Sequence, residues 1–130
     1  MNDNIDYRTD QRPDLADFAM LWRAAWGHEW SGDLERILDH SLGHLCAYDG
    51  DALIGYVNIA WDGGAHAFLL DPCVHPSHRH HGIGSALVRH AIDLARQRGA
   101  DWLHVDYEPH LDAFYKAAGF RDTRAGVIRL

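Results

Sequence analysis

The segment HPSHRHHGIGSALV, residues 75–88, separates two different hydrophobic patterns. Before it, AHAFLLDPCVH (65–75) has the run of apolar residues that is typical of a strand. After it, apolar residues such as Ile83 and Leu87 recur at helical spacing, and Gly99 is typical of a helix end. A strand, a glycine-containing loop and a helix in this order favour an anion-binding site. The free N–H groups and the positive dipole end of the helix both face the loop.

The histidines of this segment raise a second interpretation, a metal site. A zinc site needs three or four ligands that converge on one point. His80 and His81 are adjacent and would point apart, and only His78 and His81 have ligand-like spacing. No cysteine or carboxylate lies nearby in the sequence, so we expect no bound metal. A solvated loop that happens to be rich in histidine is the third interpretation.

The pattern does not match the two common nucleotide-binding loops. A Walker loop needs a Gly-Lys-Ser/Thr sequence, and this segment has no lysine. A Rossmann fingerprint needs a third glycine at position 87, which is Leu87, and its strand should be the first of a βαβ unit.

Composition excludes several classes of protein. The chain has 130 residues, of which 47% are hydrophobic, so we expect one folded domain with a real core. A net charge of −7 argues against a nucleic-acid binder, and no apolar run is long enough to span a membrane. The N-terminus is polar and acidic, unlike a signal or transit peptide. We expect Cys46 and Cys73 to be reduced core thiols of a cytoplasmic protein.

Working outward from the loop, the pattern predicts a mixed α/β (α+β) sheet flanked by helices. The expected order is β-α-α-β-β-β-α-β-α-β. Pro13 suits the first turn of the first helix, Ser31 could cap the second, and Pro72 predicts a bulge in its strand. The expected strands are 5–9, 44–48, 52–61, 65–75, 102–107 and 126–130, and the expected helices are 13–26, 33–42, 83–98 and 110–120.

Two ordered motifs resemble those of the Gcn5-related N-acetyltransferase (GNAT) family. That family carries Arg/Gln-x-x-Gly-x-Gly/Ala between a strand and a long helix, and a strand followed by a helix that ends in Tyr and then Gly-Phe. The matching residues here are Val74–Pro76, Arg79, Gly82 and Gly84 in the first motif, and Tyr115, Gly119 and Phe120 in LHVDYEPHLDAFYKAAGF (103–120) in the second. The resemblance covers essentially the whole chain. It implies a mostly antiparallel sheet and a single N-acetyltransferase domain over residues 1–130.

The resemblance also implies acetyl-CoA as co-substrate. Its pyrophosphate would lie on the N–H groups of the loop, and its pantetheine arm would pair with the main chain of the preceding strand. The implied binding residues are Cys73, Val74 and His75 along the strand, and Arg79, His80, His81, Gly82, Ile83, Gly84 and Ser85 in the loop.

The resemblance implies one residue for the general acid and two alternatives for the general base. Tyr115 matches the tyrosine that protonates the leaving thiolate. Asp71, at the expected bulge, and His104, where many members carry glutamate, are alternative general bases, with water relays. The frequent asparagine of the family falls on Glu108, so that role has no matching residue, and Glu108 would face the acceptor amine or solvent.

The acceptor pocket would be lined by the connection between the first two helices. Trp26, Glu29 and Trp30 offer an aromatic wall and a carboxylate, which suit a cationic amine. We expect the acceptor site to be open, or completed by a second subunit in a homodimer. The implied function is acetyl transfer from acetyl-CoA to a primary amine by direct attack, without nucleic acid or membrane. The alternative is a non-catalytic CoA-binding regulatory module.

Overall fold

The structure is a computed structural model and describes residues 4–130. Its elements are β1 (Ile5–Thr9), α1 (Leu15–Trp26), α2 (Leu34–Asp39), β2 (Ser41–Asp49), β3 (Ala52–Trp61), β4 (His66–Val74), a 3-10 turn η1 (Pro76–His78), α3 (Ile83–Gln97), β5 (Trp102–Val105), a 3-10 turn η2 (Pro109–Leu111) and α4 (Asp112–Ala117). The five strands form one sheet in the order β1-β2-β3-β4-β5. Every pairing is antiparallel except that of β4 with β5. The predicted fold class, a mostly antiparallel mixed sheet flanked by helices, is confirmed.

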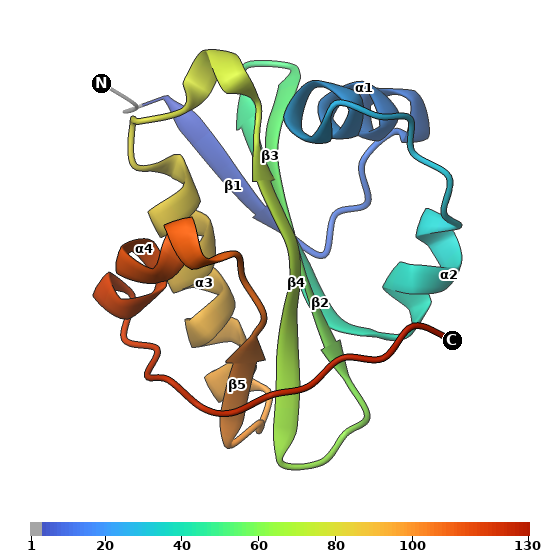
Figure 1. Cartoon of the computed structure of the whole chain (residues 1–130). Helices are drawn as coiled ribbons and strands as arrows, with labels where there is room; N and C mark the ends of the chain where they lie inside the picture. Colours follow the sequence, from blue (N-terminus) through green and yellow to red (C-terminus); the bar gives the residue numbers. More distant parts are fainter. Residues whose placement is uncertain (1–3) are drawn as a thin grey trace.

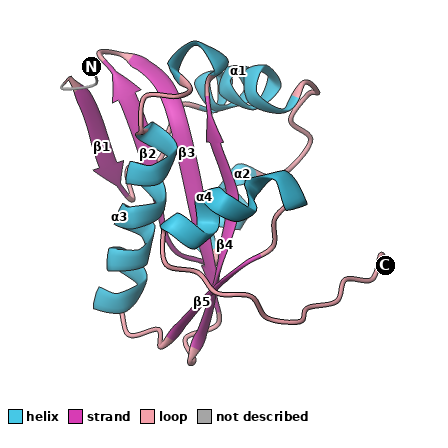
Figure 2. Ribbon diagram, turned by 60° about the vertical axis from the view of Figure 1, so that its left-hand side comes forward, coloured by secondary structure: helices cyan, strands magenta, loops and turns pink. Residues whose placement is uncertain are grey.

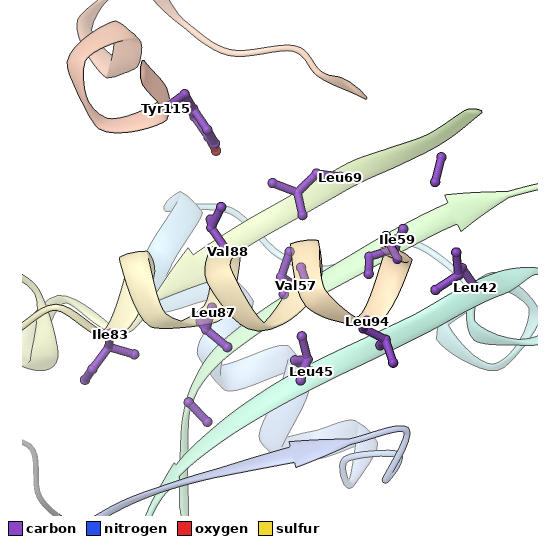
Figure 3. Close-up of a cluster of buried hydrophobic side chains, with 14 of the residues drawn as sticks. Leu42, Leu45, Val57, Ile59, Leu69, Ile83, Leu87, Val88, Leu94 and Tyr115 are labelled. Carbon is purple, nitrogen blue, oxygen red and sulfur yellow. The ribbon is translucent and has the colours of Figure 1, made fainter. Parts of the chain in front are cut away.

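Helices cover both faces of the sheet (Figures 1 and 2). α3 and α4 lie on one face, and α1 and α2 lie on the other. On the α3 face, Leu87, Val88 and Ala91 pack with Val57 and Leu69 of the sheet in the main core cluster, which Figure 3 shows. This packing follows from the helical spacing of the apolar residues of α3. A second cluster lies between the sheet and the α1 and α2 helices.

Both cysteines are free and buried, as predicted for reduced core thiols. Cys46 and Cys73 belong to the second cluster, beside Tyr56. Burial raises the pKa of each thiol to about 12, so neither is a reactive thiolate at neutral pH. Among residues 4–130, none of the helices has both the length and the apolar character required to cross a membrane.

The first two helices are shorter than predicted, for reasons of capping. α1 begins at Leu15 because Asp14 is its N-cap and accepts a hydrogen bond from the Asp17 N–H, so Pro13 lies before the helix. α2 begins at Leu34 because Asp33, rather than Ser31, accepts from the first turn. It ends before β2, so Leu42 belongs to the sheet.

The C-terminal part of the prediction is partly wrong. β5 ends at Val105 rather than residue 107, and the fourth helix is a 3-10 turn followed by a short α-helix. The predicted last strand over residues 126–130 is not formed. In the described chain these residues are extended but pair with no strand. A five-residue strand without a partner cannot satisfy its main-chain groups within a sheet.

Candidate active site

A cleft opens where β4 and β5 separate. Pairing of the two strands ends at Leu69 and Val105, whereas β3 continues beside β4 as far as Val74. One edge of residues 70–74 is therefore left without a neighbouring strand. The cleft here has a volume of about 670 Å³. Its lining comprises Ala25, Trp26, Pro72, Cys73, Val74, His78, Arg79, His80, Gly82, Ile83, Gly84, Ser85, Leu87, His110, Leu111, Phe114 and Tyr115.

The bulge predicted at Pro72 lies at the edge of this cleft. Tyr56 pairs with Cys73 and Asn58 pairs with Leu70, so Asp71 and Pro72 together oppose the single residue Val57. Asp71 has a φ of 55°, in the left-handed region that a short polar side chain tolerates. The extra residue bends the strand and turns its main chain toward the opening.

The N-terminus of α3 forms a cradle without side chains. Gly82 is the N-cap, with a φ of 82°, and no side chain among the described residues caps the helix through a hydrogen bond. A Cβ on Gly84 would meet Phe114 at 3.6 Å and Val74 at 3.8 Å, so a larger side chain would push into the cleft wall. The N–H groups of the first turn therefore have no side-chain cap among the described residues, which is the geometry that an anion-binding site needs.

Arg79 connects two walls of the cleft. Its Nε donates to the carbonyl of Val74 at 3.2 Å, and its Nη2 donates to the carbonyl of Ala25 at 3.1 Å. The guanidinium thus joins the end of β4 to the last turn of α1. The Val74 carbonyl still has a second lone pair for an added strand-like ligand. The sequence placed Arg79 in an anion-binding loop, but it gave no sign of the contact with α1.

Only some of the predicted loop histidines line the cleft. His78 and His80 both line it. His80 has a φ of 65°, and the Nε2 of His78 lies 2.9 Å from the Asp49 carboxylate. His75 turns toward Ser77, and its main-chain N–H bonds to β3. His81 is not among the lining residues. Within residues 4–130, no three metal-ligating side chains gather at one point.

Tyr115 reaches from α4 into the floor of the cleft. Its side chain is 3% exposed and points toward Val88 and Leu69 (Figure 3). It stacks on Tyr107 and meets the rings of Phe114 and Phe120 edge to face. Burial, and secondarily Tyr107, raises the pKa of the Tyr115 hydroxyl, so it carries its proton at neutral pH. The arrangement can supply a proton to an atom bound in the cleft.

The two candidate bases lie in different places. Asp71 is on the bulge, directly before the cleft-lining Pro72, and partial burial raises the pKa of its carboxyl. His104 is opposite Phe68 in the parallel ladder, about 10 Å along β4 from Asp71 at ~3.3 Å per residue. Neither side chain lines the cleft itself.

His104 forms a cluster that the sequence did not reveal. Its Nε2 is 2.7 Å from the Nδ1 of His66, and its ring stacks on Phe68 at 4.6 Å. His66 and His104 are 38 positions apart in the sequence, and the parallel pairing of β4 with β5 brings them together.

The four residues expected to bind the acceptor are not brought together. Trp26 lines the cleft and is 45% exposed. Trp30 packs edge to face against Phe18 and Trp22, in the second core cluster. Glu29 forms an exposed ion pair with Arg23, and Glu108 precedes the 3-10 turn η2 outside the cleft.

A second hollow lies on the sheet face that carries α2. It has a volume of about 510 Å³ and includes Leu70, the residue directly before Asp71. Its other lining residues are Asp33, Arg36, Ile37, His40, Asn58 and Ala60. The bulge therefore lies between the main cleft on one side and this hollow on the other.

Sequence reasoning missed several lining residues. His110, Leu111 and Phe114 come from η2 and α4, and Ala25 comes from the end of α1. The helical spacing of Leu111, Phe114 and Tyr115 was the available signal for a shared face. No local pattern could place Ala25 beside a loop that lies more than 50 residues further along the chain.

Comparisons with known proteins agree with this geometry. The sequence profile of the acetyltransferase (GNAT) family matches residues 6–120. A mycothiol acetyltransferase of Mycolicibacterium vanbaalenii is 32% identical over 113 residues, which cover 82% of this chain and 38% of the relative. This chain therefore matches well under half of the length of that relative.

Solved structures share the whole fold. A GNAT family acetyltransferase of Streptococcus pneumoniae is 29% identical, with a TM-score of 0.78 and 97% of both chains covered. An aminoglycoside N-acetyltransferase solved in complex with CoA is 21% identical, with a TM-score of 0.76 and coverage of 97% of this chain and 93% of that one. The second likeness shows the fold alone.

Proposed function

The chain belongs to the acetyltransferase (GNAT) family, and we propose that it transfers the acetyl group of acetyl-CoA to a primary amine by direct attack on the thioester. We propose further that residues 1–130 act as a single domain. The observation that carries the proposal is the cleft beside the C-terminal end of β4, which is lined by both the uncapped glycine cradle at the start of α3 and the protonated side chain of Tyr115.

The proposed co-substrate, acetyl-CoA, would bind along this cleft. The main-chain N–H groups of Gly82, Ile83, Gly84 and Ser85, with His80, His81 and Arg79, would hold the pyrophosphate. The main chain at Cys73 and Val74 would pair with the pantetheine arm as an added strand, and His75, whose own N–H bonds to β3, would lie at the end of this pairing. The bound molecule supplies an activated thioester. Main-chain N–H groups on the unpaired edge of β4, beyond the bulge, would stabilise negative charge that develops on its carbonyl oxygen.

The chemical step balances with residues on both sides of the thioester. The amine nitrogen forms a bond to the thioester carbon, and the bond from that carbon to sulfur breaks. Tyr115 donates its hydroxyl proton to the departing sulfur. The proton that the amine loses passes to Asp71 or His104, directly or through water, and Asp71 is nearer to the cleft.

The acceptor would approach from the face of the sheet that carries α1 and α2. The second hollow includes Leu70, the residue directly before the bulge, so an amine bound there would lie on this side of β4. Of the four residues that the sequence suggested for the acceptor, Trp26 forms part of the cleft wall and is the one we keep in the proposed acceptor site. An acidic chain with a net charge of −7 suits a cationic acceptor.

The remaining partners follow from charge and composition. We propose a cytoplasmic enzyme that acts as a homodimer, without nucleic acid and without a membrane. The net negative charge disfavours a nucleic-acid partner, and free thiols suit a reducing compartment.

Thiol release from acetyl-CoA in the presence of a panel of amines tests the activity. Calorimetric binding of acetyl-CoA, together with amine-dependent thiol release, is the expected result. Binding without release by any amine would favour the alternative, a non-catalytic CoA-binding module. Absence of binding would exclude both.

A further inference from the structure

Two imidazole rings meet where β4 and β5 begin. The Nδ1 of His66 lies 2.7 Å from the Nε2 of His104. The ring centroids are 4.9 Å apart, and the ring planes are inclined by 46°. At this distance one of the two nitrogens donates its N–H to the lone pair of the other. The fold therefore already turns two nitrogen atoms, both of a type that binds metals, toward one another.

A change of tautomer turns this pair into a site with two free lone pairs. A neutral imidazole carries its proton on either ring nitrogen, and a metal binds the nitrogen that has none. With the proton of His66 on Nε2 and that of His104 on Nδ1, both facing nitrogens offer a lone pair to the same point. The pair loses no proton in this change. Imidazole nitrogen is a ligand that suits copper, nickel and zinc ions.

The sheet fixes the positions of both histidines. They lie on adjacent strands of the parallel ladder, two positions out of register, and Figure 1 shows these strands side by side. Residues two positions apart face the same side of a sheet, so both rings lie on one face. The N–H groups of Asp101 and Trp102 both donate to the carbonyl of Ala65, at 2.8 and 2.9 Å, which ties the start of β5 to β4. Folding therefore orders the two ligands before any ion binds.

Phe68 supports the His104 ring from its flat side. The two ring centroids are 4.6 Å apart, and the planes are inclined by only 18°. A stacked contact of this kind uses the face of the imidazole, whereas the lone pairs of its nitrogens lie in the ring plane at its edge. The stack thus fixes the ring and leaves Nε2 free for a ligand. His66 is exposed and His104 is half-buried, so ions and water reach the pair.

The distance between the nitrogens favours copper. Metal–nitrogen bonds of about 2.0–2.1 Å place two neighbouring ligands of a square-planar ion about 2.9 Å apart, and two ligands of a tetrahedral ion about 3.4 Å apart. The observed 2.7 Å is nearer to the square-planar value, which a small rotation of the exposed His66 ring would reach. Cu²⁺ prefers this geometry, and it also binds nitrogen ligands more tightly than Ni²⁺ or Zn²⁺ does.

The rest of the coordination sphere is open to solvent. Within residues 4–130, no group of three or more metal-ligating side chains could hold an ion, so the protein supplies two ligands here and water supplies the others. The net charge of −7 attracts cations to the chain as a whole. An ion bound here takes up the lone pair on Nε2 of His104, which then cannot accept a proton.

We propose that His66 Nδ1 and His104 Nε2 form a two-histidine site for a divalent transition-metal ion, and that Cu²⁺ is the ion bound most tightly. Neither residue belongs to the histidine-rich loop of residues 75–81, where we expect no metal. The inference does not depend on acetyl transfer. It does bear on the choice of general base, because a metal-bound His104 leaves that role to Asp71.

Calorimetric titration of the full chain with Cu²⁺, Ni²⁺, Zn²⁺ and Mg²⁺ is the first test. We expect a single tightly bound Cu²⁺ ion, weaker binding of Ni²⁺ and Zn²⁺, and no binding of Mg²⁺, which prefers oxygen ligands. His66→Gln and His104→Gln should each weaken Cu²⁺ binding by about tenfold or more, since even the loss of an outer partner of a ligand typically costs that much.

The matched control removes two histidines from the loop instead. His80→Gln combined with His81→Gln should bind Cu²⁺ as tightly as the parent does. A parent that binds no Cu²⁺ would overturn the proposal. So would an unchanged affinity in His66→Gln or His104→Gln, or a loss of affinity in the loop variant.

Nuclear magnetic resonance of the histidine rings locates the ion in the unaltered protein. Cu²⁺ is paramagnetic and broadens the signals of the rings that it binds. Below one equivalent of Cu²⁺, the ring signals of His66 and His104 should broaden together and before those of the loop. Cys46 and Cys73 should not compete, because burial raises the pKa of each thiol to about 12. Earlier broadening of any other histidine would place the ion elsewhere and contradict the proposed site.

Discussion

The phenol rings of Tyr107 and Tyr115 stack with their centroids 4.7 Å apart and their planes inclined by 27°. The Tyr107 hydroxyl donates to Asp112 Oδ1 at 2.9 Å, which fixes its ring against the start of α4. Tyr115 lies against this ring, and its side chain is directed toward Val88 and Leu69 (Figure 3). The hydroxyl of Tyr107 is thus engaged by Asp112, whereas Tyr115 is a buried residue that also lines the cleft.

Tyr115→Phe should lower kcat by about 10²-fold or more, which is typical of a lost acid or base. The ring and its packing remain, so the affinity for acetyl-CoA should change little. Steady-state kinetics with one amine, together with calorimetry, measure both quantities. Tyr107→Phe is the control, because it loses only the hydrogen bond to Asp112 and should keep most of the rate. A Tyr115→Phe enzyme as fast as the parent would show that Tyr115 contributes packing and not a catalytic proton.

Gly84→Val should weaken acetyl-CoA binding by about tenfold or more, or ~1.4 kcal/mol. A Cβ fits at 3.6 Å from Phe114, but the extra methyl groups must enter the space beside the helix N-terminus. Gly82→Val should also weaken binding, but its φ of 82° adds backbone strain, so position 84 gives the cleaner test. Gly126→Val, in open space away from the cleft, is the matched control. Unchanged affinity in folded cradle variants would exclude the phosphate-binding role of this loop.

The accuracy of the sequence predictions differs between local and distant features. The bounds of β1 and β3 were predicted correctly from alternation and turn residues, and the bulge followed from the missing N–H of Pro72. These features depend on neighbours in the sequence. The His66–His104 contact and the bridge from Arg79 to Ala25 could not be predicted, because each joins residues 38 or more positions apart.

Capping and missing partners account for the errors in element bounds. Asp33 rather than Ser31 is the N-cap of α2. Both residue types favour the N-cap position, so residue preference alone does not decide between them. The expected strand at 126–130 was inferred from residue type alone. A strand also needs a neighbour, and neither edge of the described sheet meets this segment.

Arg79→Ala should destabilise the protein and loosen the cleft wall. Two hydrogen bonds, to Val74 and Ala25, are lost at a partly solvated site, so we expect a loss on the order of 1 kcal/mol in the free energy of unfolding. Denaturant titration measures this loss, and acetyl-CoA affinity should fall with it. Arg96→Ala, which removes only an exposed ion pair with Asp93, is the control and should change little. Equal stability of both variants would contradict a bridging role for Arg79.

Asp71 should give the enzyme a distinctive pH dependence if it accepts the proton of the amine. Burial raises the pKa of this carboxyl, and a base works only when deprotonated. The rate kcat/KM should therefore rise with pH along an acidic limb that lies above the usual range of aspartate, near ~3.9. Asp71→Asn should remove the limb and lower the rate. If His104→Gln removes the limb and lowers the rate instead, His104 is the general base. If both variants keep the limb and rate of the parent, neither residue is the base.

The same raised pKa also gives a stability prediction. Because the folded protein binds this proton more tightly than the unfolded chain, Asp71 contributes most stability at low pH, where both states are protonated. That contribution is lost as the pH rises through the folded pKa. Asp71→Asn removes a partly desolvated charge and keeps a side chain that tolerates a φ of 55°, so it should raise Tm at pH 7. The gain in Tm should vanish at a pH near ~3, which lies below the pKa of aspartate in the unfolded chain. Thermal unfolding across this pH range measures it, with Asp62→Asn in an exposed turn as the control. A Tm difference that is independent of pH would show that the carboxyl is not strained by its surroundings.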